Sequence, residues 1–345
     1  VVEAELLEMR AKFSDRRRTQ IVQLKKGKAV AETPVLKDVL PDQKLWISLS
    51  ADNRIGKFRE ANPPRLGGRD APNMLLSVNS GQILYLINQS GKCAALNLQS
   101  IPFVEGDGSG IALDKVTPFD QKDAIKAGFA LTSNQRKRED VTILAITRQG
   151  IAKRSKVSEL PGASADLFTL AKVNTGDEFL TAQLLCGEPD LIVLTQQGMG
   201  IRFSSSEIRT MGLISAGVNA LKLAKDDGVV DMVTVAAKGE MLLIADNGLG
   251  WRMSAETFPL QRRYGNGVIA VKMSSNVKIA GVGYGKKNSQ LSIHLKKLAA
   301  KVIRIDEIPA GKRAAAGKKL LEVKPNDGIT LVVAVQDFQE GEPPK

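Results

Sequence analysis

Residues 142–150 read TILAITRQG, and the same pattern returns at 190–198 as DLIVLTQQG and at 240–248 as EMLLIADNG. An earlier copy, QILYLINQSG, occupies residues 82–91. In each copy an apolar run is followed by a polar turn that ends in Gly, and glycine supplies the positive φ that a tight hairpin turn needs. Each copy therefore predicts a strand, a hairpin turn and the start of a second strand.

Further elements recur after each hairpin. The second strands are expected at 92–98, 151–155, 200–204 and 249–254. A third element recurs at 110–116, 167–173, 217–223, 267–273 and 317–323, so its copies start roughly 50 residues apart. A fourth strand closes each unit at 129–132, 179–185, 229–236, 277–284 and 329–336. With a more degenerate copy at 44–80, the sequence predicts six four-stranded units between residues 44 and 338.

A four-stranded unit repeated about every 50 residues is typical of a propeller blade. A lone blade leaves both of its faces exposed to solvent, whereas blades arranged in a ring bury these faces against one another. We therefore expect an all-β fold in which 44–338 form one six-bladed, propeller-like domain. The alternative is an ordinary β-sandwich whose internal similarity is accidental.

The ends of the chain differ from the repeats. Val2, Leu6, Met9 and Phe13 form a helical apolar stripe. This stripe predicts a helix within 1–20, which either packs on the array or ends a longer coiled coil. Residues 21–43 are expected to be a linker, and 339–345 a tail.

The composition excludes several classes of protein. The chain has 345 residues, 49 Lys+Arg, 37 Asp+Glu and a net charge of +12, so a polyanionic partner is expected. Two Cys cannot form a disulfide framework, and no apolar run approaches the roughly 18 residues of a membrane span. These features predict a cytoplasmic protein without a membrane partner. The N-terminus lacks Met, which suggests a piece of a longer chain.

Little in the sequence points to catalysis. There is one His, the two Cys lie far apart, and no carboxylate pair has the spacing of an acid/base site. We therefore assign no catalytic residue, no metal ligand and no cofactor to this chain.

Basic residues recur at equivalent places in the units, and equivalent places lie on one ring of a propeller. Charge runs are usually solvated faces. A basic rim nevertheless suits a bent duplex bound without sequence preference. The expected DNA-binding residues from this pattern are Lys153, Arg154, Lys156, Arg202, Arg252, Arg262, Arg263, Lys296, Lys297, Arg304, Lys312, Arg313, Lys318 and Lys319.

Several motifs resemble the C-terminal domain of the A subunit of bacterial type IIA topoisomerases, DNA gyrase or topoisomerase IV. Residues 14–21, SDRRRTQI, resemble the family's G-D-x-R-R-T-x-I. Residues 147–154, TRQGIAKR, are similar to its T-x-x-G-x-x-K/R blade motif. The resemblance implies a β-pinwheel, in which neighbouring blades exchange strands. The repeat pattern alone leaves the pinwheel and the ordinary propeller open.

The resemblance departs from gyrases at one place. Their Q-R-R-G-G-K-G box is represented in the first unit by residues 64–70, PRLGGRD, whose Arg65, Gly67, Gly68 and Arg69 are the further expected DNA contacts. Residues 261–267, QRRYGNG, are box-like but lie in the fifth unit. This departure leaves both gyrase-like supercoiling and topoisomerase IV-like decatenation open.

The resemblance implies a non-catalytic domain that bends or wraps duplex DNA for an ATP-dependent type II DNA topoisomerase, an isomerase. Such a parent would use ATP and Mg through other domains or subunits. Its partners would be DNA, the catalytic core of the same chain and the ATPase B subunit. Its location would be the cytoplasm, in association with the nucleoid. The alternative from another class is a propeller scaffold that binds an acidic protein.

Overall fold

The computed structural model describes residues 43–59, 64, 72–104, 110–164, 166–235, 239–298, 300–324 and 327–334. These residues belong to one compact unit, 38–345. The helix expected within 1–20, the linker as far as residue 42 and the tail at 339–345 lie outside the described residues. The box remnant Arg65–Arg69 lies outside them as well.

The described strands form six antiparallel sheets, which are the predicted blades. From the inner to the outer strand, blade 1 is β3 (Pro72–Asn79), β1 (Lys44–Ser50), β2 (Arg54–Phe58) and β6 (Ile111–Ala112). Blade 2 is β7 (Ile125–Leu131), β4 (Ile83–Asn88), β5 (Lys92–Asn97) and β10 (Phe168–Thr169). Blade 3 is β11 (Phe179–Cys186), β8 (Val141–Thr147), β9 (Ile151–Lys156) and β14 (Val218–Asn219).

The other three blades repeat this order. Blade 4 is β15 (Val229–Thr234), β12 (Asp190–Thr195), β13 (Met199–Ser204) and β18 (Val268–Ile269). Blade 5 is β19 (Ile279–Gly285), β16 (Glu240–Ala245), β17 (Leu249–Ser254) and β22 (Lys318–Lys319). Blade 6 has three strands among the described residues: β23 (Ile329–Ala334), β20 (Gln290–Leu295) and β21 (Lys301–Arg304).

Little helix accompanies the strands. The helix α2 spans Ser133–Arg136, and Thr132 and Gln135 form a capping box at its start. Short 3₁₀ turns follow the third strand of blades 2 to 6: η1 (Leu98–Ser100), η3 (Val157–Glu159), η4 (Ser205–Glu207), η5 (Ala255–Thr257) and η6 (Ile305–Glu307). A further turn, η2 (Leu113–Lys115), follows β6.

Glycine closes each predicted hairpin. Gly91, Gly150, Gly198 and Gly248 all have φ between +77° and +87°, the left-handed region that side chains disfavour. At Gly91 the backbone also passes close to a neighbour, because a Cβ there would lie 2.1 Å from the carbonyl oxygen of Ala171. The hairpins predicted from the repeated sequence are thus confirmed.

The outermost strand of a blade comes from the following unit of the chain. After β13 and η4 of blade 4, for example, the chain runs back to blade 3 and pairs there as β14 before it returns as β15. We call these stretches the crossing segments: 102–116, 161–173, 209–223, 259–273 and 309–323. This exchange distinguishes the pinwheel from an ordinary propeller, so the pinwheel that the resemblance implied is confirmed.

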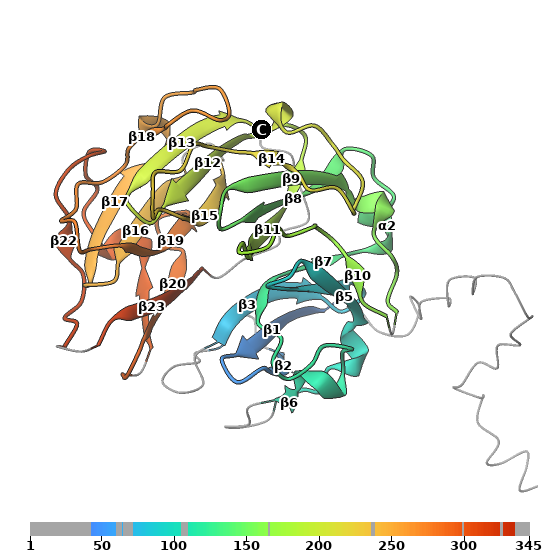
Figure 1. Cartoon of the computed structure of the whole chain (residues 1–345). Helices are drawn as coiled ribbons and strands as arrows, with labels where there is room; N and C mark the ends of the chain where they lie inside the picture. Colours follow the sequence, from blue (N-terminus) through green and yellow to red (C-terminus); the bar gives the residue numbers. More distant parts are fainter. Residues whose placement is uncertain are drawn as a thin grey trace, which may run out of the picture. The chain divides into compact units, whose positions relative to one another are not determined.

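The inner strands bring the blades together. β3, β7, β11, β15, β19 and β23 contact one another in this order, and β23 contacts β3, which closes the ring (Figure 1). Alternation along each strand sends side chains to both faces of its blade. In β1, Ile47 and Leu49 pack toward blade 2, while Trp46 packs with Val333 of blade 6. Each described junction between blades therefore has its own hydrophobic core.

Candidate nucleic-acid interface

Several of the basic residues expected to bind DNA share one register position on the third strand of a blade. Arg154 pairs with Leu144, Arg202 with Ile192 and Arg252 with Leu242. All three also form isolated bridges to the crossing segment of the next unit, at residues 210, 260 and 310. The recurrence predicted from the sequence is confirmed for these three arginines, which lie where one blade meets the next unit. It is wrong for Arg304, which pairs with Gln290 and so occupies the position of Ser204, two residues further along its strand.

Two of these arginines connect blades through hydrogen bonds. Arg252 donates from Nε to Glu240 (3.1 Å) and from Nη1 to the carbonyl oxygen of Ile308 (3.0 Å). Arg202 repeats this arrangement with Asp190 (3.0 Å) and the carbonyl oxygen of Phe258 (3.5 Å). The two carbonyl groups directly follow η6 and η5, so each guanidinium joins a carboxylate of its own blade to the next unit.

Blade 3 uses two neighbouring basic residues in a similar way. Arg154 donates to Thr142 Oγ1 (3.0 Å) and to the carbonyl oxygen of Gly187 (3.2 Å). Lys153 is 2% exposed, and its ammonium donates to the carbonyl oxygens of Leu170 (2.8 Å) and Leu213. Burial lowers the pKa of Lys153 to about 8. These side chains are thus engaged within the fold and are largely withdrawn from solvent.

Blade 2 also has a basic group at this junction, but it comes from another element. At the equivalent register position it has Ala95, which pairs with Tyr85. Here Arg136 of α2 donates to the carbonyl oxygen of Leu160 (2.7 Å), the residue that follows η3. Tyr85 Oη donates to the next carbonyl oxygen, that of Pro161 (2.7 Å). An arginine from another element therefore takes over the missing function.

Eight other expected DNA contacts are exposed, and four of them lie on crossing segments. Arg263 and Arg313 are half-buried, and each donates from Nη1 to a backbone carbonyl oxygen of the preceding crossing segment. Arg263 donates to Asn219, and Arg313 donates to Ile269. Arg304 forms an ion pair with Asp306 (3.1 Å), and Lys156 one with Glu139 (2.6 Å). The exposed members are Lys156, Arg262, Lys296, Lys297, Arg304, Lys312, Lys318 and Lys319.

The crossing segments carry further exposed cations that the sequence reasoning did not single out. Arg209, Lys222 and Lys272 are exposed on the segments of the fourth and fifth units. Together with Arg262, Lys312, Lys318 and Lys319 they form what we call the basic arc. Lys222, Lys272, Lys318 and Lys319 belong to the recurrent third element of the sequence, and Arg209, Arg262 and Lys312 precede it by five to eight residues. The structure places the strands of this element at the outer edge of the blades, where β18 and β22 lie in Figure 1.

The box-like sequence 261–267 lies on one of these crossing segments. It follows η5 and precedes β18, the strand exchanged onto blade 4. In chain order, residues 64–70 stand between the second strand β2 and the inner strand β3 of the first unit, and residues 65–70 lie outside the described residues.

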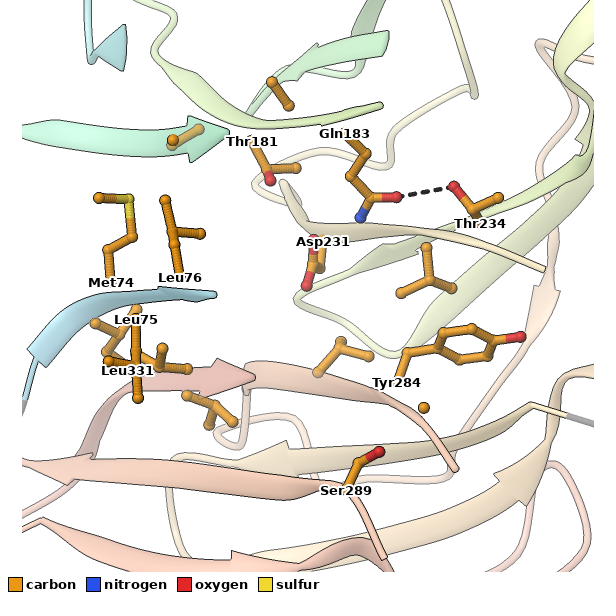
Figure 2. Close-up of a pocket in the computed structure, with 18 of the residues that line it drawn as sticks. Met74, Leu75, Leu76, Thr181, Gln183, Asp231, Thr234, Tyr284, Ser289 and Leu331 are labelled. Carbon is orange, nitrogen blue, oxygen red and sulfur yellow. Dashed lines mark hydrogen bonds between the residues drawn. The ribbon is translucent and has the colours of Figure 1, made fainter. Parts of the chain in front are cut away.

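A cavity of about 890 Å³ lies between the inner strands, with lining residues from all six blades. Figure 2 shows Asp231, Thr181 and Tyr284 around it, with Thr234 Oγ1 donating to Gln183 Oε1 (2.9 Å). Asp231 is the one carboxylate among the described lining residues, and burial raises its pKa to about 7. The cavity lacks the concentration of cations that a phosphate backbone requires.

The described residues offer no reactive cluster. They contain no group of three or more His, Cys, Asp and Glu side chains that could hold a metal ion. Cys93 is buried in the core between blades 2 and 3. Among these residues no helix is long and apolar enough to cross a membrane. The described residues thus form a strand-exchanged propeller with exposed cations on its outer edge.

Comparisons with known proteins agree with this class. The family model described as "DNA gyrase C-terminal domain, beta-propeller" matches residues 142–166, 189–236, 239–283 and 300–336. The crystal structure of the C-terminal domain of DNA topoisomerase IV superposes with a TM-score of 0.73 at 17% identity, covering 86% of this chain and 94% of that chain. A DNA gyrase A C-terminal domain structure gives 0.69 at 17% identity, covering 85% and 100%.

Whole-sequence comparison points the same way. The gyrase A protein of Aminobacterium colombiense is 25% identical over 99% of this chain, and that of Staphylococcus epidermidis is 25% identical over 98%. The matched regions are 42% and 39% of those two proteins, so the chain spans about two fifths of their length. The resemblance drawn from the sequence is confirmed: the chain is similar in sequence to gyrase A proteins and shares the fold of the C-terminal domains of gyrase A and topoisomerase IV.

Proposed function

We propose that this domain binds duplex DNA without sequence preference along its crossing segments and bends it for a type IIA topoisomerase. The observation that carries the proposal is the uneven charge of these segments. Segments 209–223 and 259–273 hold two and three basic residues and no acidic one, and 309–323 holds four basic residues and one acidic. Segment 161–173 holds one of each, and 102–116 holds three acidic residues and one basic.

This distribution favours a path over part of the ring. The three basic segments cross onto blades 3, 4 and 5, whereas the described part of segment 102–116, which crosses onto blade 1, holds one acidic and one basic residue. Phosphates are attracted to the first group, and the last offers them no net positive charge. Within the proposal, the exposed basic arc contacts DNA, while Lys153, Arg154, Arg202 and Arg252 hold the blades that carry it. Lys156, Lys296, Lys297 and Arg304 are exposed and stay candidate contacts, as do Arg65, Gly67, Gly68 and Arg69.

The parent would be an ATP-dependent topoisomerase of the cytoplasm, with ATP and Mg bound elsewhere in the enzyme. Its catalytic core and ATPase B subunit would act on the DNA segment that this domain delivers. The competing function is a scaffold for an acidic protein.

Binding of a linear duplex at increasing salt tests the proposal. A protein that makes 6–10 phosphate contacts loses roughly 10³–10⁵ in affinity between 50 and 200 mM salt because counterions are released. We expect a steep loss of this order for duplexes of unrelated sequence. A nearly flat salt response, or no binding at low salt, would favour the scaffold instead.

A further inference from the structure

The crossing segments of the fourth and fifth units expose large apolar side chains as well as cations. Seven large apolar residues are exposed in the described part of the chain, and four of them lie on these two segments: Ile214, Leu260, Tyr264 and Ile269. The side chain of Ile214 is 78% exposed and that of Tyr264 is 49% exposed. Ile214 and Tyr264 are 50 residues apart and occupy the same turn position, so we call them the apolar tips.

The tip at Tyr264 is held firmly by its neighbours. Its backbone N–H donates to the carbonyl oxygen of Ala220 (2.8 Å). In return, the N–H of Lys222 donates to the carbonyl oxygen of Gly265 (3.0 Å). The ammonium of Lys222 lies 5.2 Å from the centre of the tyrosine ring. The residue has φ +66°, an uncommon conformation that these hydrogen bonds maintain. A ring presented in this way loses little conformational entropy on binding.

Among the described residues, cations outnumber carboxylates around the tips. Arg209 precedes Ile214 on its segment, and Arg262 and Arg263 precede Tyr264. Lys222 approaches the tyrosine from the preceding segment. Two carboxylates lie nearby: that of Glu207, which accepts from the N–H of Arg263 (2.9 Å), and that of Glu159, which lies close to Gly212. A partner that combines negative charge with apolar groups at short spacing therefore fits this surface. The sugar–phosphate backbone of duplex DNA has this chemistry, because deoxyribose edges alternate with phosphates along each strand.

We propose that Ile214 and Tyr264 pack against deoxyribose edges of the duplex that the basic arc holds. This inference rests on the proposed function and deepens it. Sugar contacts fix the register and orientation of a duplex without reading its sequence. They also add an apolar component to binding that counterion release does not govern.

The test compares tip variants with charge variants over a salt series, using a fluorescent linear duplex. Ile214→Ser combined with Tyr264→Asn should weaken binding about five- to tenfold at every salt concentration, because apolar burial is lost. Asparagine tolerates positive φ, which protects the turn at residue 264. The slope of log affinity against log salt should stay unchanged, since no charge is removed. Arg262→Ala should instead lower that slope by about 1.

The matched control is Leu298→Ser, which alters a 42% exposed leucine in the turn between β20 and β21, away from the crossing segments. It should leave affinity unchanged. Hydroxyl-radical footprinting, which attacks deoxyribose, should show protected sugars that become reactive with the tip variant.

Two outcomes would overturn the inference while leaving the proposed function intact: a folded tip variant that binds like the parent chain, or one whose salt slope changes. Failure of the parent chain itself to bind duplex would instead overturn the proposed function.

Discussion

Arg252 illustrates how one side chain can look like a ligand contact in the sequence and act as a connector in the structure. Its guanidinium is buried between Glu240 and the carbonyl oxygen of Ile308. We expect Arg252→Met to lower the free energy of unfolding by about 3 kcal/mol, because a largely buried carboxylate loses its partner. Urea unfolding measures this loss.

The exposed Arg262 is the matched comparison, and Arg262→Ala should change the free energy of unfolding by less than about 0.5 kcal/mol. An equally small effect of both substitutions would show that Arg252 contributes nothing as a connector. The sequence does contain a signal for this role, since an acidic residue stands twelve positions before both Arg202 and Arg252.

Lys153 makes the stability of the domain depend on pH. Burial lowers its pKa from 10.5 to about 8, so the folded protein releases this proton before the unfolded chain does. The cost of burying the charged ammonium is therefore fully present below about pH 8 and diminishes as pH rises toward 10.5. Relative to Lys153→Met, the parent chain should become more stable across this window, as measured by urea unfolding at each pH. A constant difference between the two proteins would contradict the buried-ammonium interpretation.

At the scale of elements, the hairpins follow directly from the sequence. Gly91→Ala places a methyl group 2.1 Å from the carbonyl oxygen of Ala171 and forces a side chain into φ +77°. We expect a loss of more than about 2 kcal/mol in the free energy of unfolding, because left-handed strain alone costs roughly 1–2 kcal/mol. Gly81→Ala is the control, since a Cβ there meets nothing within 4 Å. Equal midpoint temperatures of the two variants in thermal unfolding would contradict the expectation.

The exchanged strands show where sequence reasoning ends. The repeat located the third element of each unit, but a two-residue strand such as β14 has too short a pattern to reveal its partner. Its pairing with Ala152 and Ile151 of the preceding unit is a non-local choice. Only the family resemblance indicated it. Because this pairing is non-local, the sequence located basic residues in each unit without showing which side chains would face solvent.

At the scale of the whole ring, charge follows the order of the blades. The exposed cations of the basic arc lie on segments that cross onto blades 3, 4 and 5, while the described part of segment 102–116 on blade 1 holds one acidic and one basic residue. Under the proposed function, six blades of similar shape thus offer DNA a basic surface over only part of the circumference. Bending a duplex of 20–30 bp by 40–90° costs on the order of 1–6 kcal/mol, which several phosphate contacts can offset.

A partial path predicts bending without a complete turn of DNA. Asp70 strengthens this expectation, because it places a carboxylate where the gyrase box has its last Gly. When the domain binds a nicked circle that is then religated, we expect little change in linking number.

The triple variant Lys312→Ala, Lys318→Ala and Lys319→Ala should shorten the DNA path further. It should also lower the slope of log affinity against log salt by about 3, since three exposed cations are lost. A ladder of strongly shifted topoisomers from the parent chain would show that DNA also passes over blade 1, and the partial path would then be wrong.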